Sequence, residues 1–263
     1  MAIVRAIVFW VAFMLLLFLV GSMLPKLFPP VWERFIYGIS GTGAAIMVTW
    51  LFLKNEKNGF RSIGLFWEQK TLLRFFQGLL YGTLIMGFFL SALLIFTELE
   101  LKRNPEEISI WQMFFYLSVI PLALMEEIAF RSYPFIRLKQ AFGPRLTQIF
   151  VAIAFALYHI VTGWDTRIAF LGPGIWAFVF GLAAMRSGGI AVPTGIHVAL
   201  NSIQPLMGLK SGTYASLWVL DYKPGTPETL MKKTDTIGLM LQIIVLLAAI
   251  VLTETYIRKR KDP

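Results

Sequence analysis

Eight apolar stretches of membrane-spanning length run through this chain and leave little of it for any other kind of fold. A span needs about 20 mainly apolar residues, and the candidates lie at residues 3–24, 35–53, 72–97, 109–132, 144–162, 168–186, 189–208 and 236–257. Charged residues are only 15% of the 263 residues, against about 25% in soluble domains. A β-barrel would show short alternating strands instead of long continuous runs. We therefore expect an all-α polytopic transmembrane helix bundle with about eight membrane helices, forming a single membrane domain over residues 1–263.

The distribution of basic residues predicts the orientation of this bundle. With eight spans, both termini share a side with the loops after the second, fourth and sixth spans, and that side holds 15 of the 24 Lys and Arg. The other side holds the remaining 9, which 9 acidic residues balance. Because cytoplasmic loops have an excess of Lys and Arg, we expect both termini in the cytoplasm. The first apolar run is too long for a signal-peptide core, so we expect it to be retained.

The net charge of +9 does not indicate a nucleic-acid-binding protein. The basic residues are spread over the loops and the tail without a DNA- or RNA-reading motif, so we expect them to set topology and to contact anionic lipids. The short loops and the absence of an organelle signal favour a multi-pass protein of a prokaryotic cytoplasmic membrane. The longest polar connector, 209–235, is expected to be either a small lid or a plain loop.

Glycines in the apolar stretches predict places where helices pack closely, because small residues let membrane helices approach one another. The glycines expected at such contacts are Gly38, Gly41, Gly43, Gly172, Gly174 and Gly181. Gly188 and Gly189 are expected to form a tight turn before the seventh span.

Polar side chains within the apolar stretches indicate a functional site. They are Glu126, Glu127, Arg131, His159, His197 and Asn201, and they include the only two histidines. An ionisable group in hydrocarbon costs roughly 2.5–3.5 kcal/mol on insertion scales, so such groups usually mark function. The chain has no cysteine, which excludes a thiol nucleophile, disulfides and thiolate metal sites.

The first polar motif is EExxxR. Glu127 and Arg131 are four residues apart on one helix face and can form an ion pair, while Glu126 is turned by about 100°. Two neighbouring carboxylates in a low-dielectric site cannot both ionise cheaply. If Arg131 holds Glu127, Glu126 is left to act as a general base. The structural alternative is a helix end where these side chains reach toward water.

The other two motifs are FxxxH, which ends at His159, and HxxxN, which joins His197 to Asn201 on one face. A lone histidine among apolar residues is often a satisfied core residue, and His with Asn is often a hydrogen-bonded link between helices. In a hairpin of the fourth and fifth spans, Glu126 would lie about 21 Å from the turn near Gln140, and His159 about 24 Å from Gly143 on the other side of that turn. His197 and Asn201 would also lie at mid-bilayer depth, so we expect all three helices to meet at one point.

Two hydrolytic mechanisms use these side chains. In the metal-free one, Glu126 with help from His159 deprotonates a water that attacks a peptide carbonyl, and Asn201 and His197 donate hydrogen bonds to the oxyanion. In the other, zinc is held by Glu126, His159 and His197, which leaves Glu127 as the only candidate for a separate base. We favour the metal-free version and assign no cofactor, with zinc as the alternative. No serine–histidine pair at helical spacing supports a serine mechanism.

The ordered set EExxxR, FxxxH and HxxxN over residues 110–206 resembles the CPBP family. That family groups the CAAX prenyl protease type 2 enzymes with bacteriocin-processing and self-immunity proteins, often called Abi. The resemblance implies a protease core at 110–206 in a multi-helix membrane fold with a cavity. It implies catalytic roles for Glu126, His159, His197 and Asn201, and supporting roles for Glu127 and Arg131. The implied partner is a membrane-embedded or lipidated peptide or protein.

Two non-proteolytic functions stay open. A membrane scaffold or bacteriocin self-immunity protein would keep the fold but bind a partner without hydrolysis. A transporter or proton-coupled channel could also use Glu, His and Arg in the membrane, and inverted repeats and broken helices would distinguish it. No repeat stands out, although Pro121, Pro134, Pro173 and Pro193 could break helices.

Overall fold

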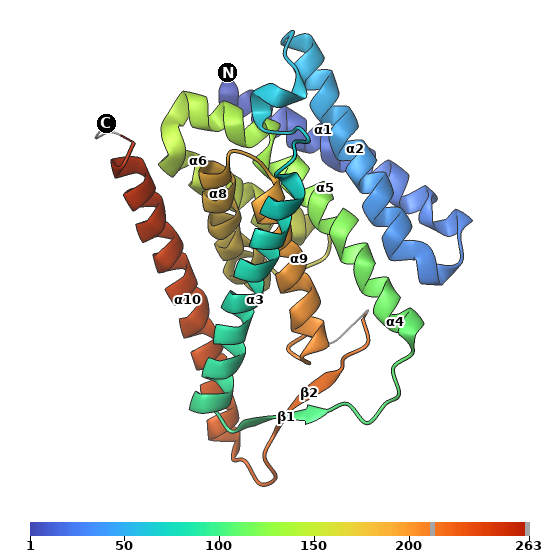
Figure 1. The fold of residues 1–263 in the computed structure, drawn as a ribbon, viewed down its shortest axis with the longest axis vertical. Coiled ribbons are helices and arrows are strands. Elements are labelled where there is room, and N and C mark those ends of the chain that lie inside the picture. Colours follow the sequence, from blue (N-terminus) through green and yellow to red (C-terminus); the bar gives the residue numbers. More distant parts are fainter. Residues whose placement is uncertain (211–213, 261–263) are drawn as a thin grey trace.

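The protein, seen here in a computed structural model that describes residues 1–210 and 214–260, is a bundle of membrane-length helices with one small sheet (Figure 1). The helices are α1 (Ala2–Met23), α2 (Glu33–Asn55), α3 (Thr71–Phe96), α4 (Ile110–Phe114), α5 (Val119–Arg131), α6 (Tyr133–Val161), α7 (Thr166–Ala169), α8 (Ile175–Ser187), α9 (Ala191–Leu206) and α10 (Glu228–Arg258). Short 3₁₀ turns lie at Pro25–Leu27, Pro30–Trp32, Phe60–Ile63 and Phe115–Ser118, and a π turn at Phe170–Gly174. The predicted all-α polytopic class is confirmed.

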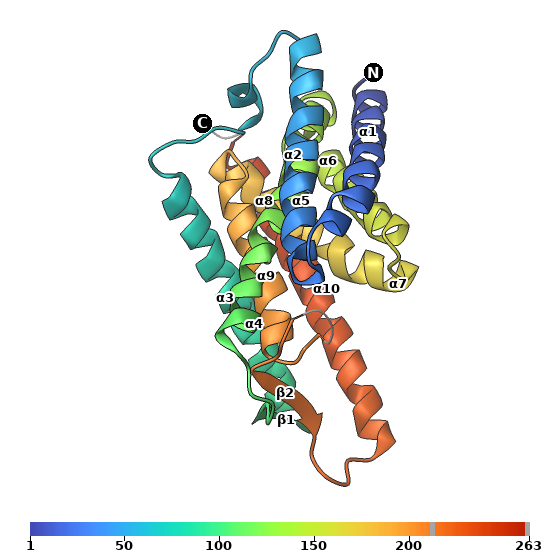
Figure 2. The same cartoon turned by 90° about the vertical axis from the view of Figure 1, so that its right-hand side faces the viewer.

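Helices occupy all eight predicted stretches. Six segments of the described chain are long and apolar enough to cross a membrane: Ala2–Leu27, Pro30–Asn55, Thr71–Phe96, Ile110–Val161, Thr166–Ser187 and Glu228–Arg258. The fourth of these contains two of the predicted spans, and α9, with 16 residues, is shorter than the rest. The start of α1 and the end of α10 lie at the same end of the molecule (Figures 1 and 2). A chain that crosses a membrane an even number of times has both termini on one side. The count of eight spans and the cytoplasmic termini stay predictions.

The burial of the helices separates an inner group from an outer one. Only 17% of the 18-residue apolar stretch of α10 is buried inside the protein, and 22% of that in the segment containing α1. The corresponding share is 61% for the segment containing α8. Large apolar side chains such as Leu15 and Phe18 on α1 and Leu247 on α10 are exposed. Apolar surface on this scale would not stay monomeric in water, and it suits contact with lipid. Helices α5, α8 and α9 therefore form the interior of the bundle.

The chain between the fourth and fifth predicted spans folds differently from the expected hairpin. The helix breaks at Ser132 (φ −100°, ψ −108°), α6 starts at Tyr133, and a second break follows at Gly143 (φ 74°, ψ 174°). Pro144 cannot donate a backbone hydrogen bond at this point. The depth argument assumed one continuous helix from Glu126 to a turn near Gln140, and that premise was wrong. Residues 133–142 form a separate helical segment instead.

Glu56 joins the helices around this break. Its carboxylate accepts hydrogen bonds from the Tyr133 hydroxyl at 2.6 Å, Arg137 Nε at 2.8 Å and Arg5 Nη1 at 2.8 Å. Burial raises the pKa of Glu56, but the hydrogen bond from Tyr133 and the charges of Arg137 and Arg5 outweigh it, so the pKa lies below its ordinary value. The ionised carboxylate therefore fastens α1 and the end of α2 to the first turn of α6.

The connector 209–235 contains the strand β2 (Trp218–Tyr222), which pairs antiparallel with β1 (Leu99–Arg103). This sheet was not predicted, because LELKR lies in the polar loop between the third and fourth predicted spans and was not assigned to a strand. The described part of the connector is held against the bundle, since Tyr214 stacks on Tyr116 at 4.7 Å and shares a hydrogen bond with Ser118 at 2.7 Å. Residues 211–213 of the expected lid or loop lie outside the described residues.

The predicted glycine contacts are partly confirmed. A Cβ atom on Gly41 or Gly181 would collide with a side chain of a neighbouring helix, one on Gly38 would be in tight contact, and one on Gly174 would be in ordinary contact. Gly43 and Gly172 have nothing within 4 Å, so the prediction was wrong for them. Gly188 adopts φ 72° and ends α8, which confirms the expected turn.

The closest helix pair is α3 and α9, which meet through glycines on both sides. A Cβ on Gly78 would overlap the carbonyl oxygen of Val192, and one on Gly195 would overlap that of Phe75. Farther along, Gly82 lies against Ile196. The contacting residue numbers rise together along both helices, so the helices run parallel. Because these glycines have no side chains, the two backbones can touch.

This packing predicts that Gly78→Ala destabilises the protein although Gly87→Ala on the same helix does not. Gly87 has nothing within 4 Å of a Cβ, so alanine there gains helix propensity of up to about 1 kcal/mol. Alanine at Gly78 forces the helices apart at a cost of about 1–3 kcal/mol. Thermal unfolding in detergent compares the two variants. Equal unfolding temperatures would contradict the close α3–α9 contact.

Candidate active site

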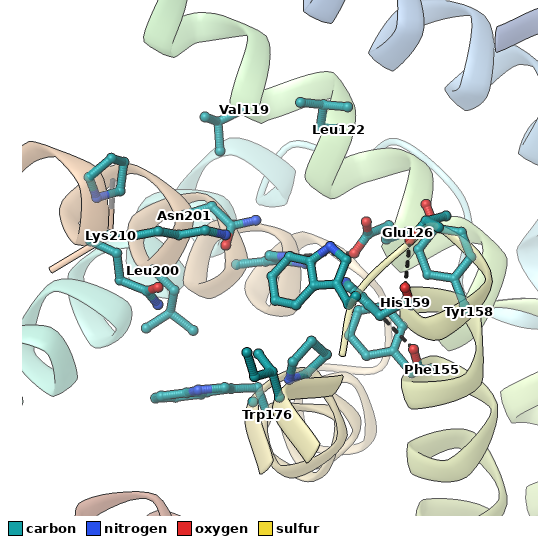
Figure 3. A pocket seen from close by; sticks show the side chains of 18 of the residues that line it. Val119, Leu122, Glu126, Phe155, Tyr158, His159, Trp176, Leu200, Asn201 and Lys210 are labelled. Carbon is teal, nitrogen blue, oxygen red and sulfur yellow. Dashed lines mark hydrogen bonds and ion pairs between the residues drawn. The ribbon is translucent and has the colours of Figure 1, made fainter. Parts of the chain in front are cut away.

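The predicted site residues lie on three helices that converge inside the bundle. Glu126 comes from α5, His159 from the end of α6, and His197 and Asn201 from α9. All four line one cavity of 660 Å³. Figure 3 shows Glu126 and His159 close together in this cavity, with Asn201 and Lys210 farther along its wall. The expected convergence is therefore present in the structure, even though the connection between α5 and α6 differs from the one assumed.

The two glutamates have different surroundings. The side chain of Glu127 is fully buried, whereas that of Glu126 is 15% exposed and faces the cavity. Successive residues of a helix point about 100° apart, so one carboxylate can enter the protein interior while the next faces the cavity. Glu127 lies behind the cavity wall and Glu126 forms part of the wall.

Glu127 contacts two partners, of which the sequence predicted only one. Its Oε1 lies 3.5 Å from Arg131 Nη1, as expected for the EExxxR spacing, and 2.9 Å from His197 Nδ1. The expectation that Glu127 serves Arg131 alone was therefore incomplete. The contact with His197 joins α5 to α9 and fixes the ring orientation, because Nδ1 is engaged and Nε2 must point elsewhere.

Arg131 is buried as deeply as Glu127 and is surrounded by aromatic rings. Its guanidinium carbon lies 4.2 Å from the ring centre of Phe155 and 5.0 Å from that of Phe180. Cation–π contacts of this kind partly replace lost hydration. Since Arg131 does not line the cavity, it reaches the site only through its contact with Glu127.

His197 stands between the two glutamates. Its Nε2 lies 3.6 Å from Glu126 Oε2, while Nδ1 contacts Glu127, and the ring stacks on Phe180 with centres 4.6 Å apart and 15° between planes. The ring is thus held on one face by packing and at Nδ1 by the Glu127 carboxylate, while Nε2 lies near Glu126 without a hydrogen bond. Among the described residues, His197 is the imidazole closest to Glu126.

His159 is fixed in another way. Its Nδ1 hydrogen-bonds to the carbonyl oxygen of Phe155 at 2.8 Å, one helical turn earlier. Phe155 and Trp164 pack edge-on against the ring, with centres 4.6 Å and 5.0 Å away. The motif FxxxH therefore has a structural meaning, since its phenylalanine supplies both the carbonyl and a packing ring. Nε2 is the nitrogen left for the cavity.

Two tyrosines near Glu126 were missed by the sequence analysis. Tyr158 hydrogen-bonds to both Glu126 and Tyr37, and both tyrosines line the cavity. The only available signal was chemical, because a tyrosine in an apolar helix needs a partner for its hydroxyl. Tyr37 lies on α2, far from the motifs in sequence, and no spacing rule would have found it.

The rest of the cavity wall combines aromatic and polar side chains with aliphatic ones. It includes Arg34, Trp164, Trp176, Gln204, Lys210, Tyr214 and Gln242. Arg34 donates a hydrogen bond from Nε to the Tyr214 hydroxyl at 3.0 Å, and the Lys210 ammonium lies 4.4 Å from the ring centre of Trp164. The connector after α9 therefore contributes to the wall.

The side chains as arranged do not fit a three-ligand zinc site. Zinc requires donor atoms about 2.0–2.2 Å from one point, and no group of three such side chains among the described residues meets this need. The Nδ1 contacts of His197 with Glu127 and of His159 with the Phe155 carbonyl leave the Nε2 atom of each ring for the cavity, an orientation that zinc-binding histidines also have. Coordination by Glu126, His159 and His197 would require these side chains to rearrange.

Comparison with known protein families bears on the same part of the chain. Residues 107–203 match the family described as type II CAAX prenyl endopeptidase Rce1-like. The central segment of the chain is therefore similar to this family. The match confirms the resemblance inferred from the three motifs, and it covers nearly the same residues as the expected core at 110–206. It supports an intramembrane CAAX-type protease in general. No curated protein matches the chain.

The buried ion pair next to this Rce1-like site generates a stability prediction. Glu127→Gln leaves Arg131 as an uncompensated buried cation, which costs about 3–5 kcal/mol. Adding Arg131→Met removes that charge, and replacing a buried pair by apolar groups is often nearly neutral. We expect thermal unfolding in detergent to show a much lower unfolding temperature for Glu127→Gln. The double variant should recover a substantial part of this loss. A double variant no more stable than the single one would refute the charge pairing.

Proposed function

We propose that this protein is an intramembrane endopeptidase that hydrolyses a peptide bond in a membrane-associated or lipidated peptide or protein. The observation that supports it most directly is the convergence of Glu126, His159, His197 and Asn201 on one cavity. The cavity lies in a helix bundle whose outer surface is apolar, and the residues belong to the Rce1-like segment.

Glu126 is the general base. Because Glu127 is engaged by Arg131 and His197, Glu126 is the carboxylate of the pair that faces the cavity. It takes one proton from a water, and the water oxygen forms a bond to the carbonyl carbon of the scissile peptide. A positioned general base accelerates such a step by about 10²–10⁴-fold. The hydrogen bond from Tyr158 orients the carboxylate.

His197 and Asn201 stabilise the oxyanion that forms on the carbonyl oxygen. As an imidazolium, His197 donates from Nδ1 to Glu127 and from Nε2 toward the cavity. Together with Arg131 and the two glutamates, it then forms a cluster of two positive and two negative groups, which leaves no net charge in the membrane. The Asn201 amide supplies the second donor.

The tetrahedral intermediate then collapses. The carbon–nitrogen bond breaks, and the proton that Glu126 accepted passes to the leaving amine nitrogen. His159 positions the attacking water through Nε2, because its Nδ1 is already bonded to the backbone. His159 is therefore needed for a fast reaction, although Glu126 and not His159 accepts the proton from the water.

The substrate reaches the cavity from the bilayer. The family description names prenylated CAAX substrates, so a prenylated C-terminal peptide is the first candidate, and a bacteriocin-like membrane peptide is the second. Aromatic side chains such as Trp164 and Trp176 in the wall suit an apolar substrate segment. We place the protein in a prokaryotic cytoplasmic membrane on the basis of its short loops.

The test is cleavage of a farnesylated CAAX peptide and of a membrane-peptide library by the full chain in nanodiscs. We expect Glu126→Gln to lower the rate by about 10²–10⁴-fold and His159→Ala to lower it strongly, with unfolding temperatures unchanged. Glu228→Gln is the matched control, since its side chain is 79% exposed at the start of α10. Phenanthroline is added in a parallel series and should have no effect.

The other outcomes identify the alternatives. Inhibition by phenanthroline that zinc reverses would mean that Glu126, His159 and His197 bind zinc, and the metal-free mechanism would be wrong. If Glu126→Gln and His159→Ala retain full activity in cells, the chain acts as a scaffold or self-immunity protein and does not hydrolyse its partner.

A further inference from the structure

A second, smaller pocket lies apart from the active site, between α6 and the end of α10. It has a volume of 240 Å³ and is lined by Lys139, Pro144, Tyr256, Ile257 and Arg260. It lies at the end of the molecule where α1 begins and α10 ends (Figure 1). We propose that this pocket binds one anionic phospholipid, with the lipid phosphate between Lys139 and Arg260.

The break in α6 creates the pocket. Gly143 adopts φ 74°, and Pro144 begins the next helical segment. The break leaves Lys139 on one segment and Pro144 on the other, both facing the last turn of α10. A continuous helix could not present both residues to the same space. The sequence feature that was read as a simple turn therefore forms one wall of a binding site.

The charges of the pocket are unbalanced. The ammonium of Lys139 lies close enough to the guanidinium of Arg260 to be repelled by it, and neither has an ion pair among the described residues. Glu254 on α10 is held by Arg145 through two hydrogen bonds of 2.6 and 2.5 Å. Two like charges beside one pocket are stabilised when an anion binds between them.

The pocket also has an apolar part at the right depth for a lipid. Pro144, Ile257 and the Tyr256 ring provide this surface, and the Arg260 guanidinium lies 4.9 Å from the Tyr256 ring centre. One to two turns away, Val251 and Leu252 on α10 and Leu146 and Ile149 on α6 are exposed, as in residues that face lipid. The pocket thus lies at the boundary between hydrocarbon and headgroups, where basic pockets between helices bind anionic lipids.

Native mass spectrometry of the full chain in detergent tests this site with phosphatidylglycerol, phosphatidylcholine and inorganic phosphate as probes. We expect Lys139→Gln with Arg260→Gln to weaken phosphatidylglycerol binding by roughly 25-fold. The matched control is Arg258→Gln with Lys259→Gln, which removes the same charge from neighbouring exposed positions outside the pocket. The control should bind like the unmodified protein, and all chains should keep the same unfolding temperature without added lipid.

Three results would overturn the proposal. An equal loss of phosphatidylglycerol binding in both double variants would mean that only the overall positive charge matters. Equal binding of phosphatidylcholine would mean an apolar groove without selectivity for anions. Displacement of phosphatidylglycerol by equimolar inorganic phosphate would mean that the pocket takes a free anion. None of these measurements depends on proteolysis, so they leave the proposed function untouched.

Discussion

The buried carboxylate of Glu127 is the interaction on which the rest of the site depends. A full charge in the interior of a membrane protein is tolerated only with partners, and Glu127 has two, Arg131 and His197. One partner is on its own helix and the other on α9, so the same charge that must be neutralised also ties the two motif helices together. This arrangement leaves Glu126, the neighbouring carboxylate, facing the cavity.

The packing of the helices makes that tie possible. The polar face of α9 reaches α5 because its opposite face lies directly on the backbone of α3, through Gly78 and Gly195. The aromatic rings of Phe155 and Phe180 then enclose Arg131 and the imidazole of His197. Glycine contacts outside and aromatic contacts inside thus hold a polar cluster in an otherwise apolar bundle.

Much of the fold and of the candidate site could be predicted from the sequence, because hydropathy and helical spacing are local properties. The helical segments, the convergence of Glu126, His159, His197 and Asn201, and the pairing of Glu127 with Arg131 all follow from such patterns. The contact between Glu127 and His197, the part played by Tyr37 and the β1–β2 sheet depend on segments distant in sequence. The break at Ser132 has a signal in the sequence, because Pro134 lies in the first turn of α6, but this proline was not used to end the fourth predicted span.

The central claim is that Glu126 activates a water that attacks the substrate directly. Single-turnover cleavage in ¹⁸O-labelled water, followed by mass spectrometry of the product and of the protein, tests it. The account predicts one ¹⁸O atom in the new carboxyl group of the product and none in the protein. Label in the Glu126 carboxylate would show that this side chain forms a covalent bond with the substrate, and the account would be wrong.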